Sequence, residues 1–113
     1  MKKKTNSAIR VVLVTAPQAE AGSIARTLLT ERLAACVNLL PGVRSLYWWD
    51  EKIVDDAEVL MIVKAPAANM RKLLKRLKAL HSYKVPEFLA LPVKESNPDY
   101  RNWVTSESLR RHK

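Results

Sequence analysis

The segment ACVNLLPGVRSLYWWD (35–50) runs directly into EKIVDDAEVLMIVKA (51–65), and this pair decides the fold. Apolar β-branched, aliphatic and aromatic residues dominate both segments, which is typical of strands. The charged DEK at 50–52 lies at or near the turn that would join them into a hairpin. Pro41-Gly42 predicts a bulge or bend in the first strand, because proline has no N–H to donate to the ladder.

Upstream of this hairpin, the chain predicts one strand and one helix. Residues 9–15 (IRVVLVT) are short and β-branched, which indicates a buried strand. Residues 16–34 are typical of a helix, with Pro17 in its first turn and small or apolar residues on one face.

Downstream of the hairpin, the order helix, strand, helix is predicted. Pro66 opens the first of these helices, whose leucines recur at helical spacing while basic residues take the other side. Residues 85–93 form the last main strand. Residues 97–112 form a terminal helix, with Asn97 as its N-cap and Pro98 at its first position.

The predicted order β-α-β-β-α-β is the split arrangement of the ferredoxin-like α+β fold. Two helices then cover one face of a four-stranded antiparallel sheet. Tyr47, Trp48 and Trp49 are consecutive, so their side chains alternate between the two faces of the strand. Large apolar groups therefore lie on a face without helices, and we expect a partner subunit to cover them.

Length and composition favour one packed domain of 113 residues, 48% of them hydrophobic. We expect a disordered basic N-terminus over 1–8 and a single domain over 9–113. Cys36 is the only cysteine, so no intrachain disulfide can form, and a reducing compartment is indicated. No apolar run approaches the ~20 residues of a membrane span. These features predict a cytoplasmic protein without a membrane partner.

The net charge of +9, from 20 basic and 11 acidic residues, raises nucleic acid as a partner. Solvated surfaces and chain ends are the preferred interpretation. RNA-recognition modules share the β-α-β-β-α-β order, but they stack bases on aromatic residues of the central strands. Here the corresponding strand contains the aliphatic EVLMIVKA (58–65), which disfavours RNA binding.

Several motifs together resemble the CutA family of divalent-cation tolerance proteins. They are VTAP (14–17), ERLAACVNLLPGVRSLYWW (31–49), EVLMIVK (58–64), LHSYKVPEFLALPV (80–93) and NPDYRNW (97–103). The resemblance runs from about residue 9 to residue 110. It implies a ferredoxin-like homotrimer, similar in architecture to the nitrogen-regulatory PII proteins, that takes part in copper or divalent-metal tolerance. It also implies binding of a metal or small ligand between subunits, without catalysis.

The metal ligands that the resemblance suggests are only partly present. A cysteine of some members corresponds to Val14, and a pair of histidines corresponds to Leu80 and His81, so only His81 matches. A strong copper or zinc site needs several closely spaced cysteine and histidine ligands. His81 is therefore a candidate for a weak site, although a solvated or capping histidine is its ordinary interpretation. Cys36 is a weaker candidate, since a buried inert thiol fits its apolar setting.

Signatures of enzymes are sparse. The two glycines exclude a glycine-rich phosphate loop, and no nucleophile elbow occurs. Lys64 and Glu87 each border an apolar strand, so each must be paired, exposed or used. We expect that these two, with Tyr83 as a neighbour, either line a ligand cleft or form a structural ion pair. A purely structural trimer that presents a surface to other proteins is a further alternative.

Overall fold

The computed structural model describes residues 8–109, which form a four-stranded antiparallel sheet in the order β2-β3-β1-β4. The elements are β1 (Ile9–Ala16), α1 (Gln18–Thr30), β2 (Cys36–Trp49), β3 (Lys52–Pro66), a 3-10 turn (Ala67–Asn69), α2 (Met70–Leu80), β4 (Leu89–Pro92) and α3 (Pro98–Leu109). This is the predicted ferredoxin-like order followed by a terminal helix. The basic start at 1–7 and His112 lie outside the described residues.

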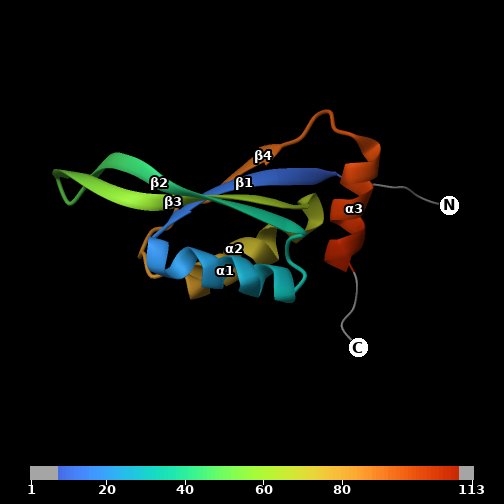
Figure 1. The fold of residues 1–113 in the computed structure, drawn as a ribbon, viewed down its shortest axis with the longest axis horizontal. Coiled ribbons are helices and arrows are strands. Elements are labelled where there is room, and N and C mark those ends of the chain that lie inside the picture. Colours follow the sequence, from blue (N-terminus) through green and yellow to red (C-terminus); the bar gives the residue numbers. More distant parts are fainter. Residues whose placement is uncertain (1–7, 110–113) are drawn as a thin grey trace.

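Helices α1 and α2 lie side by side against one face of the sheet, and α3 stands at one end of it (Figure 1). Every second residue of β1 and β3 points toward α1 and α2, as the two-residue period of a strand requires. The core between these layers consists of Val12, Val14, Ala16, Val59, Met61, Val63, Ala65, Ala21, Ile24, Ala25, Leu28, Leu73 and Leu77. Opposite this core, the central strands carry Leu13, Leu60 and Ile62, all half-buried.

The hairpin between β2 and β3 has the predicted turn and the predicted bulge. Trp49 pairs with Lys52, so Asp50 and Glu51 form a two-residue turn, and both have positive φ, 53° and 61°. Positive φ at both central residues is the signature of a type I′ turn, whose twist matches that of the strands. The register shifts between Leu40 and Val43.

This hairpin extends well beyond the rest of the sheet (Figure 1). The pairing of β1 with β3 ends at Ala16 and Val59, so residues 52–58 pair with β2 alone. Neither α1 nor α2 covers this projecting part. The side chains at its far end are accordingly exposed, and Trp48 retains 71% of its surface.

Three predicted boundaries differ from the structure. The strand expected at 85–93 is only four residues long, Leu89–Pro92, because the preceding loop, which contains Pro86, turns toward the hairpin instead of pairing. The first helix ends at Thr30, and Arg32 just beyond it has a left-handed φ of 61°. Pro66 ends β3 and is the N-cap of the 3-10 turn Ala67–Asn69, and α2 itself begins only at Met70.

The terminal helix begins as predicted. It starts at Pro98, and the side-chain oxygen of Asn97 accepts a hydrogen bond from the backbone N–H of Asp99 at 2.9 Å. Within the described residues, none of the helices is both long enough and apolar enough to cross a membrane.

Candidate functional site

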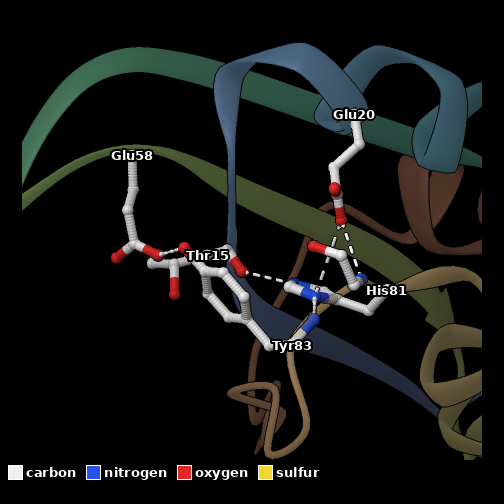
Figure 2. A network of polar contacts seen from close by, with 6 residues as sticks. Thr15, Glu20, Glu58, His81 and Tyr83 are labelled. Carbon is white, nitrogen blue, oxygen red and sulfur yellow. Dashed lines mark hydrogen bonds and ion pairs between the residues drawn. The ribbon is translucent and has the colours of Figure 1, made fainter. Parts of the chain in front are cut away.

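The loop 81–88 leaves α2 and crosses toward the base of the hairpin, and His81 anchors its start (Figure 2). The ring Nε2 lies 2.8 Å from the carbonyl oxygen of Thr15, which can only accept a hydrogen bond, so Nε2 carries the proton. The other nitrogen, Nδ1, accepts a hydrogen bond from the backbone N–H of Tyr83 at 3.1 Å. These contacts specify a neutral imidazole with both nitrogens engaged.

Of the two ordinary interpretations of His81 from sequence, the structure supports capping and not solvation: His81 is the C-cap residue of α2, and its ring is buried. The residue is 7% exposed, because the ring packs between the end of β1 and its own loop. Glu20 of α1 lies beside it, with Oε1 3.7 Å from Nδ1 and 2.9 Å from the backbone N–H of Ser82. Burial would raise the pKa of Glu20, but its hydrogen bonds to Ser82 leave that pKa lowered.

Tyr83 links this loop to the hairpin (Figure 2). Its hydroxyl donates to Oε2 of Glu58 on β3 at 2.5 Å. Glu58 is only 5% exposed, so this carboxylate is buried at the point where the hairpin leaves the sheet. Burial, followed by the hydrogen bond to Glu58 and its negative charge, raises the pKa of Tyr83, which keeps the hydroxyl protonated.

A cavity of about 680 Å³ lies between the base of the hairpin and this loop. Its lining combines aromatic and apolar walls with two carboxylates and two basic side chains: Thr15, Arg44, Ser45, Leu46, Tyr47, Trp49, Glu58, Tyr83, Lys84, Val85 and Glu87. The volume is typical of sites for small organic ligands, ~300–1,000 Å³. This cavity is therefore our candidate functional site.

On the hairpin side of the cavity, two further acids are held by cross-strand contacts. The hydroxyl of Tyr47 donates to Oδ2 of Asp56 at 2.5 Å, and this bond is the main cause that raises the pKa of Tyr47 to about 12. Arg44 binds both carboxylate oxygens of Asp55, at 3.0 and 2.7 Å. The charge of Arg44, which also lines the cavity, is therefore paired with that of Asp55.

Glu87 lines the cavity from the loop side. Burial and then the negative charge of Glu58 raise its pKa above the ordinary value. The structure thus brings Tyr83 and Glu87, two of the predicted cleft residues, to one cavity. Sequence analysis missed Glu58, although it follows the acidic run of the same strand and precedes its buried part.

Lys64, the third predicted cleft residue, lies elsewhere. It is six residues further along β3 than Glu58, or ~20 Å at the usual rise of a strand. Its Nζ donates to Oδ1 of Asn38 and lies 4.0 Å from the sulfur of Cys36. Cys36 is half-buried. Burial, followed by the neighbouring Cys36, raises the pKa of Tyr100.

The two predicted metal ligands are not neighbours of each other. His81 contacts the end of β1 at Thr15, whereas Cys36 faces Lys64 near the other end of β3. Among residues 8–109, no group of three or more histidine, cysteine, aspartate or glutamate side chains could hold a metal ion.

The side chains of the three consecutive aromatic residues alternate between the two faces of the hairpin, as the two-residue period of a strand requires. Tyr47 and Trp49 line the cavity. Trp48 points to the other side of the hairpin, where it pairs with Ile53 beside Leu46. These three apolar side chains, which we call the hairpin patch, are 71%, 64% and 60% exposed, respectively.

Comparison with known proteins identifies relatives along nearly the whole chain. A family model described as CutA1 divalent ion tolerance protein matches residues 10–107. A divalent-cation tolerance protein CutA of Thermus thermophilus is 50% identical over 95 residues, which cover 83% of this chain and 92% of the relative.

Solved structures give the same fold. A PII-like protein CutA from Nostoc in its apo form has a TM-score of 0.84 and 34% identity, and the match covers 88% of this chain and 96% of that one. A protein described as the periplasmic divalent cation tolerance protein CutA of Archaeoglobus fulgidus has a TM-score of 0.85 and 35% identity, with coverage of 88% and 98%.

Proposed function

The chain belongs to the family of CutA1 divalent ion tolerance proteins, and from this premise we propose that it contributes to divalent-cation tolerance by binding a small ligand between the subunits of a cytoplasmic homotrimer. The observation that carries this proposal is the cavity at the base of the hairpin, one wall of which is formed by the same hairpin that carries the exposed hairpin patch on its other face. Leu46 belongs to both, so a neighbouring subunit that covers the patch would also contact one edge of the cavity wall.

The exposed apolar surface supports the assembly. Leu46, Trp48 and Ile53 form a contiguous group on a projecting hairpin that the helices of the same chain do not reach. Burying ~200 Å² of aromatic surface at ~25 cal/mol/Å² contributes several kcal/mol per subunit before the costs of association. The charged strand residues around the patch, Arg44 and Asp55, form an ion pair with each other and so do not oppose its burial.

Binding without catalysis fits the chemistry of the cavity. His81, the only histidine among residues 8–109, has both ring nitrogens in hydrogen bonds to the backbone and is not available as a general base. The tyrosines of the cavity have raised pKa values and remain protonated. The polar groups therefore favour recognition of a ligand rather than proton transfer.

Copper or zinc can enter this proposal only as a weakly bound ion. Coordination by His81 would break the hydrogen bond to Thr15 or the one from Tyr83, since a metal ligand needs a free nitrogen. A metal ion bound to Cys36 would find few further ligands, because the polar side chains beside the thiol are those of Lys64 and Tyr100.

The assembly is tested by light scattering of the purified protein and of Trp48→Asp. We expect three times the chain mass of 12.8 kDa for the unmodified protein and a smaller species for the variant. Ser23→Asp is the matched control, because it places the same charge on an exposed position of α1. A mass of one chain for the unmodified protein at micromolar concentration would refute the trimer.

The metal is tested by calorimetric titration with Cu²⁺ and Zn²⁺, repeated on His81→Gln and Cys36→Ser. We expect weak binding or none, without the heat of a multidentate site. Tight binding that either variant removes would show that metal itself, rather than a ligand of the cavity, is what the protein recognises.

A further inference from the structure

The buried wall of the cavity offers hydrogen-bond acceptors. The hydroxyl of Tyr83 donates a hydrogen bond to Glu58, and that of Tyr47 donates one to Asp56. Neither hydroxyl proton is therefore available to a ligand. An ionised carboxylate has no donor and can accept about four hydrogen bonds, so Glu58 keeps capacity beyond the one from Tyr83. Glu87 adds a second carboxylate to the lining, at an exposed position. A ligand that satisfies these groups must bring donors and positive charge.

The remaining walls favour a cation with an apolar body. Tyr47, Trp49 and Tyr83 contribute aromatic rings to the cavity, and Leu46 and Val85 contribute aliphatic surface. Aromatic faces attract cations through their quadrupole, and indole is the strongest of the three side-chain types. The same rings bury the hydrocarbon part of a ligand favourably.

The basic side chains of the lining do not reverse this preference. Arg44 is held by both oxygens of Asp55, and its side chain is 72% exposed. Lys84 is also exposed, so water screens its charge. Glu58, by contrast, is 5% exposed, and a charge at that depth is screened far less. Among the described lining residues, the one buried charge of the cavity, Glu58, is therefore negative, whereas Arg44, Lys84 and Glu87 are exposed.

We propose that this cavity binds a primary ammonium ion carried on an apolar or aromatic body. The inference deepens the proposed ligand-binding function and rests on it. A bare divalent metal fits less well, because the described carboxylates do not converge into a group that could hold one ion. A primary ammonium supplies three donors and no acceptor, which matches carboxylates whose hydroxyl neighbours are already paired.

The class of ligand is tested with three probes of nearly the same shape and different charge. Benzylammonium, benzyl alcohol and benzoate are titrated into the full chain at neutral pH, with ligand-observed NMR and tryptophan fluorescence as readouts. We expect benzylammonium to bind about tenfold or more tightly than benzyl alcohol, since a cation–π contact together with the buried carboxylate of Glu58 supplies a factor of about ten. Benzoate should bind least.

Two variants place the probe at the cavity. Glu58→Gln should weaken benzylammonium about tenfold and leave benzyl alcohol unchanged, because the amide still accepts from Tyr83 but carries no charge. Asp50→Asn is the matched control: it removes the same charge from the same hairpin, at the exposed turn, and should have no effect. Glu87→Gln repeats the test at a less buried position if Glu58→Gln does not fold.

The inference would be overturned by equal binding of benzylammonium and benzyl alcohol, by equal losses in Glu58→Gln and Asp50→Asn, or by binding of none of the probes. Tighter binding of benzoate would also overturn it, yet would leave the cavity a ligand site of opposite preference. Each of these results is distinct from failure of the proposed function. The proposed function would fail if the protein were a single chain in solution or if it coordinated metal tightly.

Discussion

The Nε2 of His81 donates to the carbonyl oxygen of Thr15 at a point where β1 has no strand partner on that side. β4 pairs with β1 only as far as Leu13, so Thr15 would otherwise present an unpaired carbonyl at the edge of the sheet. Nε2 of His81 supplies the donor that a neighbouring strand would otherwise provide to this carbonyl. The other ring nitrogen, Nδ1, accepts a hydrogen bond from the backbone N–H of Tyr83. One side chain thus joins the sheet to the loop that carries the cavity wall.

His81→Ala should therefore lower the free energy of unfolding by about 2–4 kcal/mol, because it removes buried volume and leaves two backbone groups without partners. Denaturant unfolding at fixed protein concentration measures this. His81→Gln should recover part of the loss, since its amide offers one donor and one acceptor. Lys78→Ala, at an exposed position of α2, is the control and should change little. A loss below about 0.5 kcal/mol for His81→Ala would mean that the ring does not hold the loop.

Asp56→Asn should lower the apparent pKa of one tyrosine. The hydrogen bond to Asp56 is the main reason that the pKa of Tyr47 rises to about 12, followed by burial and by the charges of Asp56 and Glu58. The variant removes the charge, so the pKa should move toward the ordinary value of 10.0. Absorbance of tyrosinate during a pH titration detects the change. Asp55→Asn is the matched control because Asp55 binds Arg44; an equal shift in this control would indicate a general charge effect.

Glu87→Gln should stabilise the protein at neutral pH but not in acid. The folded state raises the pKa of Glu87 above its ordinary value of 4.5, through burial and then the charge of Glu58. Ionisation is therefore more costly in the folded chain than in the unfolded one, and the unmodified protein loses stability as pH rises through this raised pKa. The difference in thermal midpoint should be near zero below about pH 4 and should grow toward neutrality. Glu95→Gln, on an exposed loop, serves as the control, and a difference independent of pH would contradict the assignment.

Local sequence signals were sufficient for the hairpin and for the order of elements. The Asp50-Glu51 turn, the bulge at Pro41-Gly42 and the cap at Asn97 each depend on residues close together in the chain. The family resemblance was likewise carried by contiguous motifs and is confirmed.

The cavity could be predicted only in part, because its contacts join residues far apart in sequence. His81 and Thr15 are 66 positions apart, and Tyr83 and Glu58 are 25 apart, so no local pattern reports either contact. Lys64 was grouped with Tyr83 and Glu87 for its charge at a strand border. Its position along β3 places it beside Asn38 and Cys36 instead, and only the register of the sheet reveals this.

The two glycines of this chain should respond to alanine in opposite directions. Gly42 lies in the bulge of β2 with φ +76°, a conformation that a side chain disfavours. Gly42→Ala should therefore destabilise the protein by about 1 kcal/mol or more, although nothing within 4 Å would contact the new methyl group.

Gly22 lies inside α1, where an added Cβ would also meet nothing within 4 Å. Glycine lowers helix stability by about 0.8–1 kcal/mol relative to alanine, so Gly22→Ala should stabilise by roughly that amount. Denaturant unfolding of both variants at the same protein concentration gives the comparison, with each glycine serving as the control for the other. Both substitutions add the same methyl group into open space, so opposite signs would isolate the backbone conformation as the cause. Equal effects would show that the bulge relaxes to accept a side chain, and that Gly42 is not what shapes the base of the hairpin.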